Sequence, residues 1–113
     1  MHELSIMQSA LSLALDQARQ AGAVRVHLIR LRIGALSGVV PEALEFAFEA
    51  LTPGTLAEGA KLAIDPVPAR FWCAKCTSEF QSDDMFAECP GCHSPSGELR
   101  AGREMELASL EID

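Results

Sequence analysis

The sequence predicts an α+β fold, in which a three-stranded β-sheet is packed by two helices and carries an inserted, zinc-ribbon-like module with four cysteines. Three observations predict it. Two segments have the apolar periodicity of a helix, three have that of a strand, and all the cysteines lie between the last two strand segments. We therefore expect a discontinuous domain over residues 1–69 and 103–113, interrupted by a cysteine domain over residues 70–102.

The first helix is expected over residues 5–21. Its apolar residues recur every three or four positions along one stripe: Leu4, Met7, Leu11, Ala14 and Ala18. Ser5, followed three residues later by Gln8, matches a capping box, so Ser5 is the expected N-cap. Gly22 stands where a residue in the left-handed conformation ends many helices.

The second helix is expected to begin at Pro41, because proline suits the first helical position and Glu42 then falls in the first turn. Its predicted apolar face consists of Leu44, Ala47, Phe48 and Leu51. The turn residues Thr52-Pro53-Gly54 end it. The strands are expected over 24–33, 61–67 and 104–112. In the first of these the apolar phase shifts after Leu28, which indicates either a bulge or a strand covered on both faces.

The four cysteines form two pairs, Cys73-Ala-Lys-Cys76 and Cys89-Pro-Gly-Cys92, with twelve residues between the pairs. Each pair allows a tight turn to present two sulfurs to one ion, and four thiolates in a tetrahedron are typical of structural zinc. A module of this size buries too little apolar surface to fold alone, so a metal crosslink is expected. The sequence therefore predicts a structural Zn(II) ion bound by Cys73, Cys76, Cys89 and Cys92.

Other interpretations of the cysteines are weaker. Two disulfides would need an oxidising compartment, and a single Cys-x-x-Cys redox pair leaves the second pair unexplained. The segment from Cys89 to His93 also matches a c-type haem attachment pattern, which does not account for Cys73 and Cys76. His93 could instead act at the zinc centre. Four protein ligands leave no open position for metal catalysis, and no nucleophile–base pattern is present, so we do not expect an enzyme.

Composition limits the partners and the compartment. No apolar run approaches the roughly 20 residues that a membrane-spanning helix needs, and the first residues lack a signal-peptide pattern, so we expect a cytoplasmic protein. The net charge of −7 disfavours nucleic acid as a partner, because an acidic surface repels phosphates. A cation, or a basic surface on another protein, suits this charge better.

Several motifs, which run from the first residue to the last, carry a resemblance. The chain opens Met1-His2-Glu3, continues with Arg32–Ser37 and Pro41–Glu49, and closes with Glu104–Glu111 after the paired cysteines. With these motifs in this order, the chain resembles the HypA/HybF family of hydrogenase nickel-incorporation proteins. The resemblance implies a nickel metallochaperone that works with a GTPase of the HypB type and delivers Ni(II) to the large subunit of a [NiFe] hydrogenase. Some relatives also serve urease maturation.

The resemblance also implies a nickel site at the start of the chain. The Met1 amine, the His2 amide nitrogen and the His2 imidazole can close chelate rings on one ion, and Ni(II) accepts such nitrogen-rich tetragonal sets. Glu3 would add an oxygen or orient His2. Some relatives have an acidic residue near the nickel where this chain has Val40, which cannot bind a metal. The competing hypothesis is a zinc-ribbon interaction module that transfers no nickel.

Overall fold

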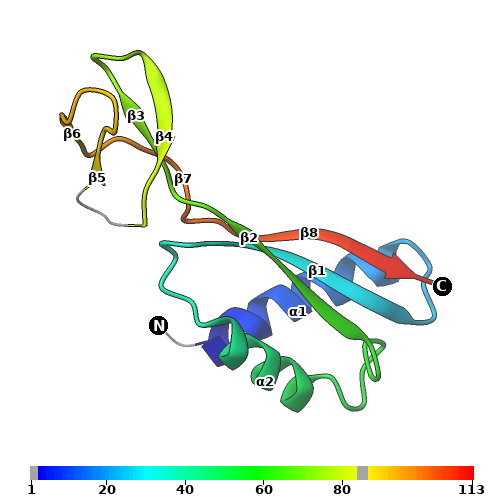
Figure 1. Ribbon diagram of the computed structural model, residues 1–113. Coiled ribbons are helices and arrows are strands. Elements are labelled where there is room, and N and C mark those ends of the chain that lie inside the picture. Colours follow the sequence, from blue (N-terminus) through cyan, green and yellow to red (C-terminus); the bar gives the residue numbers. More distant parts are fainter. Residues whose placement is uncertain (1–2, 84–86) are drawn as a thin grey trace. The chain divides into compact units, whose positions relative to one another are not determined.

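The computed structural model describes residues 3–83 and 87–113, which divide into two units (Figure 1). The first unit comprises the described residues of Met1–Arg32, together with Val39–Asp65 and Glu106–Asp113. The second comprises Ile33–Gly38 and Pro66–Met105. The predicted fold class is confirmed: two helices accompany a three-stranded sheet, and short strands surround a group of four cysteines.

The first helix, α1, spans Glu3–Gln20. Its buried face consists of Met7, Leu11, Ala14, Leu15 and Ala18. Two details of the prediction were wrong: Leu4 is 51% exposed, and Ser5 lies inside the helix rather than at its N-cap. The helix begins earlier because Glu3 is well suited to the first turn, where a carboxylate interacts favourably with the helix dipole.

The end of α1 follows the prediction. Gly22 has a φ of 75°, the left-handed conformation that glycine adopts without steric cost. The N–H of Ala23 then donates to the carbonyl of Ala18 at 2.9 Å, and the N–H of Gly22 donates to the carbonyl of Arg19. These bonds satisfy carbonyls at the helix end that would otherwise lack a partner within the helix.

The second helix, α2, spans Pro41–Leu51, as predicted. Leu44, Ala47 and Phe48 are buried, and Leu51 is half-buried. Val40 is the N-cap residue and makes no capping hydrogen bond with its own side chain. Neither helix of the described chain is long and apolar enough to cross a membrane.

The three-stranded sheet has the order β2-β1-β8, formed by Lys61–Val67, Val26–Gly34 and Met105–Ile112. In the central strand, Ile29, Leu31 and Ile33 alternate as buried residues, which is the pattern of a strand with one face against helices. Figure 1 shows α1 and α2 on the same side of this sheet. Val26 is also buried although it precedes this alternation, so the phase shift seen in the sequence is present in the burial pattern.

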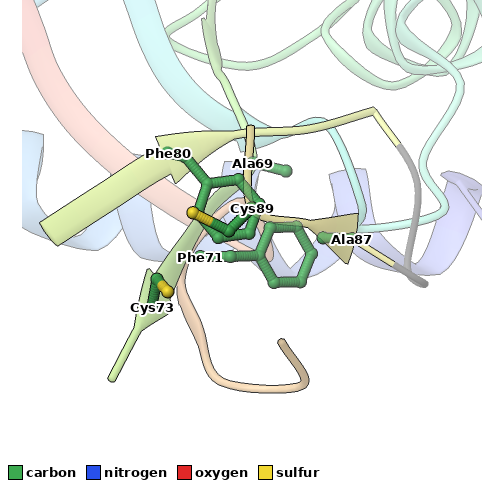
Figure 2. Packing of buried hydrophobic residues seen from close by; sticks show 6 residues of the cluster. All are labelled: Ala69, Phe71, Cys73, Phe80, Ala87 and Cys89. Carbon is green, nitrogen blue, oxygen red and sulfur yellow. The ribbon is translucent and has the colours of Figure 1, made fainter. Parts of the chain in front are cut away.

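The second unit is built from short strands. One sheet has the order β4-β3-β7, formed by Ser78–Gln81, Arg70–Cys73 and Leu99–Ala101. The other pairs β5, Ala87–Glu88, with β6, Pro95–Ser96. Figure 2 shows the core, which consists of Ala69, Phe71, Cys73, Phe80, Ala87 and Cys89. The rings of Phe71 and Phe80 stack with centroids 5.8 Å apart, so one aromatic pair provides much of this core.

Two glycines in the second unit allow chain segments to pass unusually close together. A β carbon at Gly34 would lie 2.1 Å from the carbonyl carbon of Gly102. A β carbon at Gly102, whose φ is 126°, would lie 2.8 Å from the α carbon of Ala69. The N–H of Leu36 also donates to the carbonyl of Gly102 at 2.7 Å. Larger residues at Gly34 or Gly102 would therefore have to displace backbone rather than side chains.

Candidate metal centre

The sulfur atoms of the four cysteines lie within 4.8 Å of one another. The Sγ atoms of Cys73 and Cys92 are 3.5 Å apart, and those of Cys76 and Cys89 are 3.9 Å apart. The four cysteines are free rather than joined in disulfides. The structure thus gathers both pairs, as the sequence spacing predicts, into one group that could hold a metal ion.

Two similar turns position these sulfurs. In the first turn, Cys73 ends β3 and Cys76 lies in the connection to β4. In the second, Cys89 follows β5 and Cys92 precedes β6. The residue after each second cysteine is left-handed: Thr77 has a φ of 49° and His93 a φ of 62°.

Both of these residues carry a side chain, although the left-handed conformation is strained for any residue with a β carbon. The same left-handed conformation occurs at both turns, which indicates that it orients the cysteine side chains of each turn toward one another. Hydrogen bonds fix the second turn, where the Cys89 N–H donates to the Ser94 carbonyl and the His93 N–H donates to the Cys89 carbonyl.

Hydrogen bonds also set the protonation of two thiols. Contacts with the Cys92, Cys89 and Cys73 thiols, in that order of size, raise the pKa of Cys76 to about 12. The hydroxyl and backbone N–H of Ser94 donate to the Cys92 sulfur and lower the pKa of Cys92 to about 6. In the metal-free group these opposite shifts favour ionisation of Cys92 before Cys76.

The donor set fits a tetrahedral Zn(II) ion. Four sulfurs about 2.3 Å from one ion at tetrahedral corners are roughly 3.8 Å from each other, and the separations of 3.5 Å for Cys73–Cys92 and 3.9 Å for Cys76–Cys89 bracket that value. The backbone N–H of Cys76 points at the sulfur of Cys73 at 3.4 Å, the kind of outer contact that orients a metal ligand. Only a small adjustment of the side chains is needed for a metal.

The group is unevenly buried. Cys73 and Cys89 belong to the core of the unit, Cys92 is half-buried, and Cys76 is exposed. Beside it, Nδ1 of His93 lies 2.9 Å from Oε1 of Glu88, and both side chains are exposed. His93 thus pairs with a carboxylate instead of joining the four sulfurs.

The predicted nickel residues are only partly covered by the structure. Met1 and His2 lie outside the described residues. Glu3 is in the first turn of α1, and its Oε2 accepts a hydrogen bond from the backbone N–H of Val40 at 3.2 Å. This contact joins the start of α1 to the start of α2, two positions separated by 37 residues in sequence.

Comparison with known proteins identifies the family. The sequence profile of the family described as "Hydrogenase/urease nickel incorporation, metallochaperone, hypA" matches residues 1–112. The chain belongs to the HypA family. It is 48% identical to the hydrogenase maturation factor HypA of Picosynechococcus sp. over 99% of both chains, and 42% identical to that of Methylocella silvestris over the full length of both.

Two solved structures have the same fold as this HypA-family chain. The solution structure of the Ni metallochaperone HypA from Helicobacter pylori matches with a TM-score of 0.68 and 27% identity, covering 99% of this chain and 97% of that one. A second solution structure of a HypA protein matches with a TM-score of 0.70 and 28% identity, over 99% and 96% of the two chains. The resemblance seen in the sequence motifs is thereby confirmed.

Two contacts in this HypA-family chain could not be read from its sequence. Ser94 donates to the Cys92 sulfur, and the Val40 N–H donates to Glu3. A serine two residues after the last cysteine is too common a feature to indicate a sulfur hydrogen bond. The bond to Val40 comes from the backbone, so the side chain at that position gives no signal for it.

Proposed function

We propose that this protein is a nickel metallochaperone that binds Ni(II) at its N-terminus and delivers it during the maturation of a [NiFe] hydrogenase. The observation that carries the proposal is the match of a nickel-incorporation family along the whole chain. Two relatives are named hydrogenase maturation factor, which supports a hydrogenase as the protein that receives the nickel. Ni(II) is the cargo, and the protein carries out transfer rather than turnover, so we propose no enzymatic activity.

The nickel ligands we propose are the Met1 amine, the His2 amide and imidazole nitrogens, and Glu3 as an oxygen ligand or a residue that orients His2. The hydrogen bond from Val40 to Glu3 supports this assignment, because it fastens the first turn of α1 to a second element. A nitrogen set of this kind must lose protons to bind metal, so nickel affinity falls as the pH drops through the titration of the imidazole.

Zn(II) is the proposed occupant of the cysteine group, bound by Cys73, Cys76, Cys89 and Cys92. The ion would act as a crosslink between the two cysteine turns and would supply folding free energy to the second unit. In this assignment residues 70–102 are the zinc-binding domain, and residues 1–69 with 103–113 are the nickel-binding domain.

The partners we propose are a nickel-handling GTPase of the HypB type and the large subunit of a [NiFe] hydrogenase, with urease maturation factors as additional partners. The family description, which names both hydrogenase and urease, supports this range. Free cysteines in a metal-binding arrangement fit a reducing compartment, so we propose a cytoplasmic location.

The decisive experiment uses the untagged protein, a variant extended ahead of Met1 by a histidine-free tag of several residues, and His2→Ala. We expect both changes to abolish most Ni(II) binding while one zinc ion stays bound, because they remove the chelate nitrogens without touching the cysteines. Titration calorimetry with metal analysis measures both quantities. His27→Ala is the matched control, because His27 is an exposed histidine on β1 and should leave nickel binding unchanged.

The competing function, a zinc-ribbon interaction module without nickel transfer, predicts a different outcome. Untagged protein would then bind zinc but show no affinity for Ni(II) at neutral pH. Unchanged nickel binding in both N-terminal variants would instead retain a nickel function but move the site away from Met1 and His2.

A further inference from the structure

The outer face of α2 combines an exposed aromatic ring with three carboxylates. Phe46 is 76% exposed, although it lies in a regular helix. Glu42, Glu45 and Glu49 are exposed around it. At 3.6 residues per turn, positions 42, 46 and 49 share one side of the helix, opposite to the buried Leu44 and its neighbours. We call Glu42, Glu45, Phe46 and Glu49 the acidic face of α2.

Glu42 lies in the first turn of α2, where the helix dipole favours a carboxylate, but the spacing of the three glutamates works against the stability of the helix. Glu42 and Glu45 are three positions apart, and Glu45 and Glu49 are four apart, so like charges are neighbours on the helix surface. Glu49 also lies near the C-terminal end, where the helix dipole disfavours a negative charge. The like-charge spacing and the position of Glu49 do not stabilise the helix, which points to a role in binding.

No cation within the described chain neutralises this face. The ion pairs found among residues 3–83 and 87–113 involve other carboxylates, for example Asp16 with Arg19 and Asp65 with Arg30. The three glutamates are therefore available to positive groups of another molecule, and they surround an apolar side chain whose burial would favour association.

The position of the face relates it to the start of the chain. α2 begins beside the first turn of α1, because Glu3 accepts the N–H of Val40. Val40 and Leu4, which adjoin this contact, are each 51% exposed. A protein docked at the start of α2 would thus lie near Glu3, the proposed nickel ligand that the structure describes.

We propose that the acidic face of α2 is the docking surface for the protein that exchanges nickel with this chain, and that this partner presents an apolar pocket rimmed by Lys and Arg. That this partner exchanges nickel with the chain rests on the proposed function. That its surface is basic follows from the charge of the acidic face. Three negative charges repel a second copy of the same face and repel nucleic acid, whereas a basic surface complements them. Aromatic residues such as Phe are enriched in the cores of protein–protein interfaces, and the rims of such interfaces are polar.

The test measures the affinity of the metal-free, full-length protein for two purified probes, the HypB-type GTPase and the hydrogenase large-subunit precursor of the same organism. Phe46→Ala should weaken binding to at least one probe by about tenfold or more. The triple variant Glu42→Gln, Glu45→Gln, Glu49→Gln should weaken it too and should remove most of its dependence on salt concentration. Helical circular dichroism verifies that each variant is folded.

Matched controls lie in the same unit. Val24→Ala removes a side chain that is also 76% exposed, and Glu106→Gln with Glu111→Gln removes charges on β8. Both controls should bind like the wild type. The proposal is overturned if neither probe binds the wild type, if Phe46→Ala binds like the wild type, if Val24→Ala weakens binding equally, or if the triple variant keeps its salt dependence.

Two further measurements separate the possible failures. Ni(II) binding to Phe46→Ala should equal that of the wild type. If docking persists in these variants while nickel binding stays intact, the docking proposal fails and the metallochaperone function stands. Native mass measurements test the other occupant: a dimer of this chain that Phe46→Ala dissociates would assign the face to a second copy and overturn the proposal.

Discussion

The two units of this protein differ in what holds them folded. In the first unit, helices of 18 and 11 residues bury apolar side chains such as Met7 and Leu44 almost completely. In the second, the strands have two to four residues, and two of the six core residues are cysteines of the candidate metal centre. The first unit can be stabilised by burial alone, whereas in the second unit two residues of the candidate metal centre are also part of the hydrophobic core.

The comparison predicts that metal removal unfolds the second unit and that a cavity in the hydrophobic core destabilises the first. Each unit can be followed by its own spectroscopic signal. Trp72, the one tryptophan of the sequence, lies in the second unit, and both helices lie in the first. Tryptophan fluorescence therefore reports on the cysteine unit, and circular dichroism at 222 nm reports mainly on the helical unit.

Removal of the metal should have the largest effect. A strong chelator, or Cys89→Ser, should change the Trp72 fluorescence to that of an exposed ring, because sites of this kind contribute about 10–16 kcal/mol of apparent folding free energy. The signal at 222 nm should remain. Ser109→Ala, on β8, is a control that should change neither signal. A parallel loss of helix would show that the first unit also depends on the metal, contrary to the comparison.

A cavity in the first unit should give the reverse pattern. Leu44 has no exposed surface, so Leu44→Ala should lower the free energy of unfolding measured at 222 nm by about 2–5 kcal/mol. The midpoint followed by Trp72 fluorescence should stay unchanged. Leu13→Ala, at a position 49% exposed, is the matched control and should have little effect. Equal shifts of both signals would mean that the two units unfold as one.

Metal affinity should fall in acid. Cys76, with a pKa of about 12, carries a proton at neutral pH that the metal must displace, while Cys92, with a pKa of about 6, is already ionised. Zinc affinity should therefore rise by at least about tenfold per pH unit between pH 6.5 and 7.5, as competition with a chromophoric chelator can show.

Ser94→Ala extends the same measurement. It removes the hydroxyl that stabilises the Cys92 thiolate, so a further proton must leave on metal binding and the pH dependence should become steeper. A pH-independent affinity in either protein would contradict a thiolate centre.

Loss of the contact between the helices should have a smaller effect. Glu3→Ala removes the acceptor of the Val40 N–H and should destabilise the first unit by about 0.5–2 kcal/mol, the range for loss of a helix cap. Glu3→Gln keeps an acceptor and should recover part of the loss. Amide hydrogen exchange of Val40 measures the contact directly, and an unchanged rate in Glu3→Ala would refute it.

The smallest predicted effect is stabilising. Thr77→Gly should raise the stability of the second unit by up to about 1 kcal/mol, because glycine adopts a φ of 49° without the strain that a β-branched residue carries. Urea unfolding followed by Trp72 fluorescence measures it. Thr55→Gly is the contrasting substitution in the first unit, at a residue whose hydroxyl makes two hydrogen bonds, and should destabilise that unit when unfolding is followed at 222 nm. The Thr77 hydroxyl donates to the Cys76 carbonyl at 2.7 Å, so a decrease in Thr77→Gly would show that this hydrogen bond outweighs the backbone strain.

The sequence by itself determined the features that depend on local pattern. The bounds of α2 and of β2 followed from apolar periodicity and from proline and glycine, and the grouping of the cysteines followed from their spacing. These features are encoded within a few neighbouring residues, where the physics of capping, turns and metal ligation acts directly.

Only the tertiary structure decided the contacts between distant segments. It placed Glu3 on Val40, began α1 at Glu3 instead of Ser5, left Leu4 exposed, and brought the backbone of Gly34 against Gly102. Such contacts depend on how elements pack in three dimensions, and residues 37 positions apart carry no periodic signal of their meeting. The helical pattern shows which residues can face a core, but packing decides which of them do.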